Sequence, residues 1–256
     1  MKLCRKIFGL AYRLILPIID PLKFLIAIPR YFLFFIDLVR YNGIRSLNRA
    51  SVIDLHPVLN DKTSVTSIDA AYFYQGVWAF EKILQSGVKH HTDIASQTDL
   101  VAYLSKVMKV TFVDIRPLYA KLDNFISVRG TITNLPFDDD SIGSLSCLHV
   151  VEHIGLGRYG DSLDPEGTTK AFRELKRVLA PGGNLYLSLP IGKERICFNA
   201  HRVTSPKTVL SYFQDLEMVE VRCTGDDGSV DEHPDIDSYE DKVYSMGFFH
   251  FRKPSA

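Results

Sequence analysis

The segment HHTDIASQTDLVAYLS, residues 90–105, has the pattern of a strand, a short turn and a helix, the unit from which open α/β sheets are built. Between the predicted strand and the predicted helix stand Ala95, Ser96 and Gln97. A dinucleotide-binding turn carries glycines at these positions. The segment therefore predicts a ligand site at the end of a strand, but its turn hinders the close approach of a pyrophosphate.

The same alternation continues along the chain. Strands are predicted at residues 89–95, 109–114, 124–128, 142–149, 184–189, 217–223 and 244–252, and helices at 68–85, 98–107, 166–179 and 205–214. Because strands alternate with helices, we expect an α/β fold with a Rossmann-like, doubly wound and mostly parallel sheet of seven strands. This domain is expected over residues 68–256, after an N-terminal helical segment (1–50) and a linker (51–67). The acidic stretch at 226–241 predicts a solvated loop.

Residues 1–50 are apolar and basic, with nine Lys or Arg residues and two acids. Charged residues interrupt the apolar run, so no uncharged stretch approaches the roughly 20 residues that a membrane-spanning helix needs. Pro17, Pro21 and Pro29 predict a segment divided into short pieces. We expect a kinked amphipathic element on an anionic membrane surface. Packing on the protein's own body or on a second subunit is the alternative.

The chain as a whole is electrically balanced, with 30 basic and 30 acidic residues among 256. This balance gives no general affinity for nucleic acid. The cysteines Cys4, Cys147, Cys197 and Cys223 are widely spaced and form no CxxC pair. We therefore expect free thiols in a reducing compartment, and hence a cytoplasmic protein, peripheral on the inner membrane face if its N-terminal segment binds lipid. The sequence leaves the oligomeric state open.

Polar residues follow several predicted strands, at the edge where a doubly wound sheet binds its ligands. Asp93 lies at the end of the first strand, and Asp114 ends the second strand 21 positions later. That spacing suits a carboxylate, Asp114, that accepts hydrogen bonds from both hydroxyls of a ribose. Thr131 and Ile132 follow the third strand, and His149 follows the fourth. The predicted site thus gathers residues from four strands.

Three stretches carry a resemblance to a known family: NLPFDDDSIGSLSCLHVVEHIG (134–155), ELKRVLAPGGNLYLSLP (174–190) and HRVTSPKTVLSYF (201–213). They resemble the class I S-adenosylmethionine-dependent methyltransferases, in particular the type-11-like branch whose fourth strand leads into a His-Val-x-Glu-His turn. The runs GLGRYGDSLDPEG (155–167) and KERICFNAHR (193–202) are closer still to an uncharacterised bacterial domain-of-unknown-function family. The resemblance covers residues 68–252.

This resemblance implies S-adenosyl-L-methionine as the cofactor, which has no pyrophosphate and so tolerates a turn without glycine. The residues expected to bind it are Asp93, Ala95, Ser96, Gln97, Asp114, Ile115, Thr131, Ile132 and His149. The sequence departs from the family pattern at Thr131, where an acid often accepts from the adenine amino group, and at Gly143, where a further acid is absent. Both departures weaken the expected grip on adenine.

Methyl transfer from a sulfonium is an in-line displacement that depends on alignment more than on a base. If a base acts, its place at the strand end favours His149, which we expect to titrate near neutrality. Glu152 and His153 are the next candidates. The alternative is that these three residues form a turn of polar side chains bonded to the backbone.

Contacts with the substrate are expected from the loops that follow the fourth and fifth strands: Arg158, Tyr159, Arg195, Asn199, His201 and Arg202. Their mixture suits a small polar acceptor, such as a sugar or an envelope glycan intermediate. No metal is expected, since Asp164 and Glu166 fit the cap and first turn of a helix. The alternative function is a non-catalytic, membrane-associated binding or scaffold protein with a decayed cofactor site. A nicotinamide-dependent oxidoreductase is disfavoured by the turn after the first strand.

Overall fold

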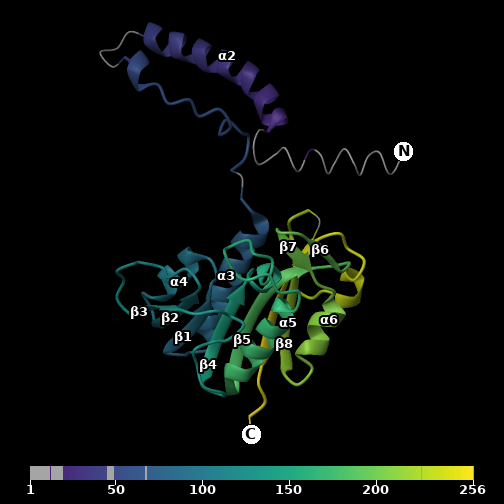
Figure 1. Ribbon diagram of the computed structural model, residues 1–256. Coiled ribbons are helices and arrows are strands. Elements are labelled where there is room, and N and C mark those ends of the chain that lie inside the picture. Colours follow the sequence, from purple (N-terminus) through teal and green to yellow (C-terminus); the bar gives the residue numbers. More distant parts are fainter. Residues whose placement is uncertain (1–11, 13–19, 45–48, 67, 226, 256) are drawn as a thin grey trace. The chain divides into compact units, whose positions relative to one another are not determined.

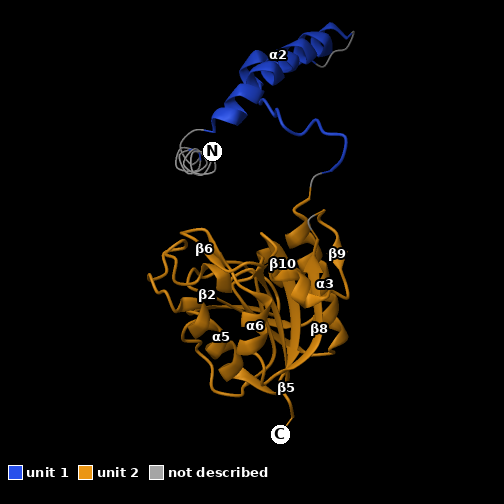
Figure 2. Ribbon diagram, turned by 90° about the vertical axis from the view of Figure 1, so that its right-hand side faces the viewer, with its two compact units in different colours: residues 1–67 blue, residues 68–256 orange. Residues whose placement is uncertain are grey.

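The computed structural model describes residue 12 and residues 20–44, 49–66, 68–225 and 227–255 (Figure 1). The chain divides into two compact units, residues 1–67 and residues 68–256 (Figure 2). Most of the predicted N-terminal segment before Asp20, including Pro17, lies outside the described residues. Cys147, Cys197 and Cys223 are free thiols as expected, whereas Cys4 lies outside the described residues.

The first unit is built on one long helix, α2 (Pro21–Gly43). The carboxylate of Asp20 caps it by accepting from the amides of Leu22 and Lys23. The prediction that Pro29 divides this segment is wrong, because the helix runs through it. A short helix, η1 (Val52–Asp54), follows. No helix in the described part of the chain is both long enough and apolar enough to cross a membrane.

The second unit contains an eight-stranded sheet in the order β3-β2-β1-β4-β5-β10-β8-β9. Its strands are β1 (His90–Ile94), β2 (Lys109–Asp114), β3 (Phe125–Arg129), β4 (Ile142–Leu148), β5 (Leu179–Ile191), β8 (Glu217–Thr224), β9 (Val230–Asp231) and β10 (Ser245–Arg252). The first five run parallel, and β10 is antiparallel to β5 and β8. The predicted Rossmann-like, doubly wound sheet is confirmed. Its eighth strand, β9, lies in the acidic stretch predicted to be a loop.

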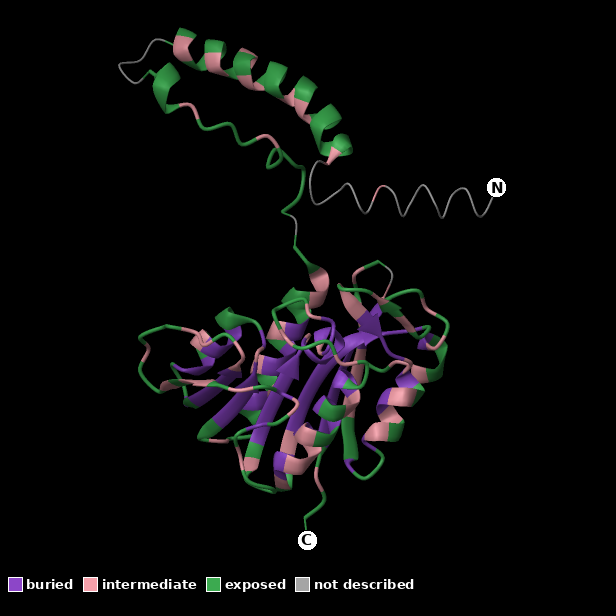
Figure 3. Cartoon of the chain, in the orientation of Figure 1, coloured by how far each residue is buried: buried purple, intermediate pink, exposed green. Residues whose placement is uncertain are grey.

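Helices cover both faces of this sheet (Figure 1). On one face, α3 (Ala70–Gln85) and α4 (Thr98–Leu104) bury Trp78 and Leu104 against Phe112 and Phe248. On the other face, α5 (Gly167–Val178) and α6 (Pro206–Tyr212) pack on the sheet. Figure 3 shows the strands as the buried centre of the unit. The alternating apolar residues of the sequence thus fill two layers of core.

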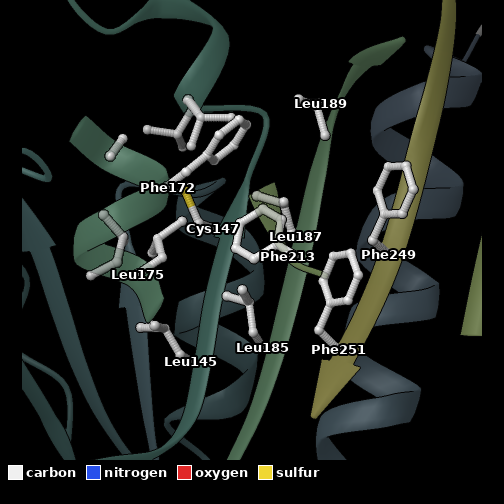
Figure 4. Packing of buried hydrophobic residues seen from close by; sticks show 14 of the residues in the cluster. Leu145, Cys147, Phe172, Leu175, Leu185, Leu187, Leu189, Phe213, Phe249 and Phe251 are labelled. Atoms are coloured by element: carbon white, nitrogen blue, oxygen red, sulfur yellow. The ribbon is translucent and has the colours of Figure 1, made fainter. Parts of the chain in front are cut away.

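The core under α5 is dense in leucine and phenylalanine. Figure 4 shows the side chains of Leu145 and Cys147 of β4, Leu185 and Leu187 of β5, and Phe249 and Phe251 of β10, which share one cluster with Phe172 and Leu175 of α5. All of these side chains are buried. Because β4 and β5 are fixed by this packing, the residues that follow them are held at one edge of the sheet.

Two further elements at this edge are absent from the sequence prediction. A single turn of helix, η2 (Val151–His153), begins directly after β4. A small hairpin of β6 (Arg195–Cys197) and β7 (His201–Val203) follows β5. Each element is only three residues long, too short to show a periodicity in the sequence.

Candidate functional site

The carboxyl edge of the sheet is hollowed into a cavity of about 550 Å³, a size typical of small-ligand sites. Its wall comes from the ends of β1, β2, β3 and β4 and from the insertion that follows η2. Six residues predicted to bind the cofactor line this wall: Ala95, Asp114, Ile115, Thr131, Ile132 and His149. The structure therefore brings most of the predicted set together.

The turn after β1 supplies only Ala95 to the cavity. Ala95 has a left-handed backbone, with φ of 53°, where glycine is the usual residue. Ser96 is buried: its amide donates to Oδ1 of Asp93 at 2.9 Å, and its Oγ accepts from the amide of Leu148 at 3.0 Å. Gln97 is exposed at the start of α4. Asp93, Ser96 and Gln97, all predicted to bind the cofactor, are thus not part of the cavity wall.

Asp93 belongs instead to a buried network within the sheet. Its Oδ2 accepts from Oγ of Ser146, and Nε2 of His91 lies 2.8 Å from the same hydroxyl. Nδ1 of His91 lies 2.8 Å from Oγ of Ser144. Burial raises the pKa of Asp93 to about 6 and lowers the pKa of His91 to about 3, so the imidazole is neutral. These groups tie β1 to β4 rather than contact a ligand.

Asp114 ends β2 on the wall of the cavity, with a side chain that is 10% exposed. The contacts that the structure shows for its carboxylate involve Oδ1, which accepts from the Arg116 amide at 2.7 Å and lies 3.7 Å from Arg116 Nε. The guanidinium of Arg116 lies over the ring of Tyr159, 4.4 Å from its centroid. Arg116, which sequence reasoning missed, also lines the cavity.

The wall after β3 combines polar and apolar side chains. The hydroxyl of Thr131 lies 2.9 Å from that of Thr133, and both residues line the cavity. Ile132 is buried and also reaches the cavity. This segment therefore offers an apolar surface beside two hydroxyls where an acid is usual.

His149, Glu152 and His153 form a compact cluster after β4. Nε2 of His149 lies 3.4 Å, and Nε2 of His153 3.6 Å, from Oε1 of Glu152. The backbone of His149 is left-handed, with φ of 61°, and its ring packs against Tyr72 at 4.6 Å. Burial lowers the pKa of His149 to about 3, so the expectation that it titrates near neutrality is wrong. Its role as a base stays a prediction.

The two other members of this cluster are also perturbed by burial. Burial raises the pKa of Glu152 to about 8 and lowers the pKa of His153 to about 4. His149 and His153 line the cavity, whereas Glu152 is wholly buried behind them. The predicted candidates therefore lie together, with one of them beyond the reach of a ligand in the cavity.

The residues predicted to bind substrate are only partly brought to the cavity. Tyr159 lines it. Arg158 is not among the residues of the cavity wall, but its guanidinium lies over the Tyr159 ring, 5.1 Å from the centroid, and donates to the carbonyl oxygen of Ala200 at 3.0 Å. The other candidates, Arg195, Asn199 and His201, belong to the β6–β7 hairpin and are not among the residues of the cavity wall.

Arg202 has a structural role instead of the predicted one. Its Nη1 donates to the carbonyl oxygen of Ile154 and lies 3.1 Å from Oγ1 of Thr168. Its Nη2 donates to the carbonyl oxygen of Asp164 at 3.4 Å. The side chain is buried by these contacts and holds both ends of the insertion after η2. The guanidinium is therefore occupied by the protein itself.

Asp161 shapes the insertion that carries Tyr159. Its Oδ2 accepts from the amide of Gly155 at 2.7 Å, and its Oδ1 accepts from the amide of Tyr159 at 3.3 Å. Gly155 has φ of 79°, and a Cβ there would lie 2.0 Å from the carbonyl oxygen of Asp164. Three glycines spaced around one aspartate, in GLGRYGD, are the sequence signal for this turn.

Comparison with known protein families gives one partial match. A family model described as "Caenorhabditis protein of unknown function, DUF268" matches residues 139–244, which is less than half of the chain. That description is not of a bacterial family, and the expected branch therefore stays a prediction. Among curated proteins, none matches the chain by sequence.

Two solved structures are similar to the chain at low sequence identity. The N-methyltransferase NodS from Bradyrhizobium japonicum, in complex with S-adenosyl-L-homocysteine, is 17% identical with a TM-score of 0.51, over 73% of this chain and 90% of NodS. The [4+2]-cyclase SpnF is 13% identical with a TM-score of 0.51, over 72% of this chain and 81% of SpnF. The covered part of the chain thus has a Rossmann-like fold similar to that of the methyltransferase NodS.

Proposed function

We propose that residues 68–256 form an S-adenosylmethionine-dependent methyltransferase that acts on a small polar acceptor. The observation that carries this proposal is the carboxylate of Asp114 on the wall of the 550 Å³ cavity, at the end of the second parallel strand. In a doubly wound sheet this is where a carboxylate accepts from the hydroxyls of a ribose. The fold shared with NodS supports the same cofactor.

The cavity residues suggest how each part of the cofactor is held. Asp114 would accept from the ribose hydroxyls, while Ile115 and Ile132 would supply apolar surface to the adenine. The left-handed turn at Ala95 would present its backbone to the amino-acid end. When bound, the cofactor supplies an electrophilic methyl group, and the protein's contribution is to align the acceptor with it and to exclude water.

We assign the acceptor to the polar side of the cavity that carries Tyr159. Tyr159 stacks with the guanidinium groups of both Arg116 and Arg158, at 4.4 and 5.1 Å from its ring centroid. An aromatic ring beside cationic donors suits a polar acceptor rich in oxygen, such as a sugar. We therefore propose a sugar or an envelope glycan intermediate as the acceptor.

Calorimetric titration tests the cofactor assignment. The protein should bind S-adenosylmethionine and S-adenosylhomocysteine with one site per chain, and should not bind a nicotinamide dinucleotide. Failure to bind either sulfur compound would overturn the proposal. It would favour the alternative of a non-catalytic binding or scaffold protein, for which the inward-facing Asp93 and Ser96 are the supporting observation.

SpnF gives a second reason for a direct assay of methyl transfer. The fold that it shares with this chain belongs there to a protein named a cyclase, so fold alone does not fix the reaction. Transfer of a labelled methyl group from S-adenosylmethionine to a panel of sugars and sugar phosphates is the expected result. Cofactor binding without transfer to any polar acceptor would contradict the proposed substrate class.

We also propose that α2 binds an anionic membrane surface on the cytoplasmic side. None of its residues is buried, and Phe24, Leu25 and Phe32 are each at least 64% exposed. The N-terminal fifty residues carry nine Lys or Arg residues and two acids, and Lys23, Arg30 and Arg40 belong to α2 itself. Apolar residues with flanking basic side chains are the composition of helices that lie in the lipid headgroup layer.

Vesicle sedimentation tests this membrane role. The full chain should sediment with vesicles that contain phosphatidylglycerol, and much less with vesicles of phosphatidylcholine alone. Phe32→Glu should reduce sedimentation, because it places a charge in the lipid-facing surface of the helix. Val65→Glu is the matched control, since Val65 is 73% exposed outside the helix. Equal loss in both variants would contradict a specific role for α2.

A further inference from the structure

We propose that His149, Glu152 and His153 form a binding site for one divalent cation of the zinc class. One ligand atom of each residue lies within 4.8 Å of the other two, and Nε2 of each histidine faces Oε1 of Glu152. Two imidazoles and one carboxylate are a ligand set that zinc accepts in catalytic sites. The site is formed by a single stretch of five residues after β4.

The spacing of these atoms fits metal ligands better than hydrogen bonds. Oε1 of Glu152 lies 3.4 Å from Nε2 of His149 and 3.6 Å from Nε2 of His153. Both separations are longer than good N–H···O hydrogen bonds. Ligands bound at 2.0–2.1 Å around a tetrahedral ion lie roughly 3.3–3.4 Å apart. The two separations to Glu152 match this spacing, and the ligand nitrogens of the two histidines, within 4.8 Å of each other, would have to move closer together around the cation.

Glu152 has no other partner that would explain its burial. Its side chain is 0% exposed, and neither carboxylate oxygen accepts a hydrogen bond from another residue in the described part of the chain. A buried polar group without a partner is unfavourable, and a cation would supply the partner that the Glu152 oxygens lack. The nearest candidates to share that cation are the two histidine rings on either side.

The ring of His153 is oriented as a metal ligand. Its Nδ1 lies 2.7 Å from the carbonyl oxygen of Ala200, which only accepts, and 3.4 Å from Nη1 of Arg158, which only donates. The shorter contact assigns the proton to Nδ1. The lone pair of the ring is then on Nε2, the atom that faces Glu152. A backbone carbonyl that fixes the tautomer in this way is the usual companion of a histidine bound to a metal.

The site has an open side. His149 and His153 line the cavity, while Glu152 lies behind them, so a cation held by these three residues would have its fourth position toward the cavity. Water would take that position in the free protein. An oxygen of the polar acceptor would take it during the reaction. This last step rests on the proposed function, whereas cation binding does not.

Titration of the full chain with zinc tests the proposal. The chain should carry no affinity tag, and its metals should first be removed by dialysis against a chelator. We expect one equivalent of Zn²⁺ to bind and to raise the unfolding temperature, because the cation binds only the folded protein. Glu152→Gln keeps the shape of the side chain and should weaken binding at least a hundredfold. His153→Ala should weaken it similarly. The control, His90→Ala, removes a histidine at the opposite end of β1 and should leave binding unchanged.

The unfolding temperature gives a second readout that does not depend on activity. In metal-free protein at neutral pH Glu152→Gln should unfold at about the same temperature as the native chain, because a buried carboxyl without a cation stays neutral and the amide has nearly the same shape. With Zn²⁺ the native chain should unfold at the higher temperature, because only its carboxylate can bind the cation. Equal affinity of Glu152→Gln and the native chain for Zn²⁺, or no saturable binding by the native chain, would overturn the proposal. These experiments contain no S-adenosylmethionine. Either outcome therefore says nothing about the methyltransferase proposal, which the calorimetric titration with the cofactor tests separately.

Discussion

Arg177 of α5 donates from Nη1 to the backbone carbonyl oxygen of Phe137 at 2.8 Å, across 40 residues of sequence. Nη2 of the same guanidinium donates to the carbonyl oxygen of Leu135 at 3.1 Å. Glu174, which pairs with Arg177, accepts from the Leu135 amide at 2.7 Å. The "LPF" and "ELKR" motifs are therefore two sides of one clamp. It fixes the loop that continues from the cavity wall at Thr133.

Replacing Arg177 should release this loop. Arg177→Met keeps much of the apolar stem but leaves two backbone carbonyls and Glu174 without their donor, which should lower the free energy of unfolding by about 1–3 kcal/mol. Urea denaturation measures the change. Arg173→Met, at an exposed position on the same helix, should alter stability by less than about 0.5 kcal/mol. Equal effects of the two substitutions would show that the clamp is not stabilising.

Most of the fold could be predicted because its strands and helices are long enough to show a period. The predicted strand at 142–149 and the observed β4 (Ile142–Leu148) differ by one residue, because the strand ends in a run of buried residues that begins at Ser144. By contrast β9 is two residues long, and its acidic neighbourhood is typical of a loop. Short elements whose partners lie elsewhere in the chain leave no such signal.

The sequence predicts which strand ends form the site, but it does not predict where each side chain points. Asp114 could be placed because it directly ends a buried strand. Ser96 could not, because its hydroxyl faces the amide of Leu148, 52 residues away on β4. Arg202 was misplaced for the same reason, since the backbone oxygens that occupy it belong to a distant insertion. The type of a residue predicts which bonds its side chain can make. Tertiary structure decides which group, in the protein or in a ligand, forms those bonds.

Asp114→Asn should weaken cofactor binding. The substitution keeps the size of the side chain but replaces the charged group that we propose as the acceptor of the ribose hydroxyls, which should cost about 1.5–3 kcal/mol, or roughly ten- to a hundredfold in Kd. Calorimetry with S-adenosylhomocysteine measures it. Asp123→Asn, at an exposed position in the loop before β3, is the control and should bind normally. Unchanged affinity of Asp114→Asn would remove this carboxylate from the cofactor site.

Asp93 predicts a dependence of stability on pH. Burial raises its pKa from 3.8 to about 6, so the folded protein keeps a proton that the unfolded chain releases. The stability from this group is full below about pH 4 and is lost as pH rises through about 6, by about 3 kcal/mol in all. Stability should therefore fall over this window relative to a variant that cannot titrate.

Asp93→Asn isolates this effect. The amide is neutral at every pH, and the chain of hydrogen bonds through Ser146 and His91 can reverse its direction to suit it. The difference in unfolding free energy between the native chain and Asp93→Asn should change by about 3 kcal/mol between pH 4 and pH 7. Asp99→Asn, at an exposed position, should show no such change. If the difference in unfolding free energy between the native chain and Asp93→Asn stays constant between pH 4 and pH 7, the pKa of Asp93 is not raised by burial and the carboxylate is charged in the folded protein.

Ala95 tests the cost of a turn without glycine. With φ of 53°, this residue has a left-handed backbone that costs an L-amino acid about 1–2 kcal/mol. Ala95→Gly removes that cost but adds about 0.5–1 kcal/mol of chain entropy, so it should leave stability unchanged or raise it by up to about 1 kcal/mol. Ala95→Val should lower stability by about 2 kcal/mol, because a branched Cβ fits this conformation worse.

A matched pair at Ala102, within α4, should give the opposite sign for glycine. In a right-handed helix Ala→Gly lowers stability by about 1 kcal/mol, because glycine loses more chain entropy and gains no relief of strain. Urea denaturation of Ala95→Gly, Ala95→Val and Ala102→Gly therefore separates backbone strain from a general effect of residue size. A loss of stability in Ala95→Gly as large as in Ala102→Gly would contradict a strained turn. It would indicate that the methyl group of Ala95 is itself needed to shape the cavity wall.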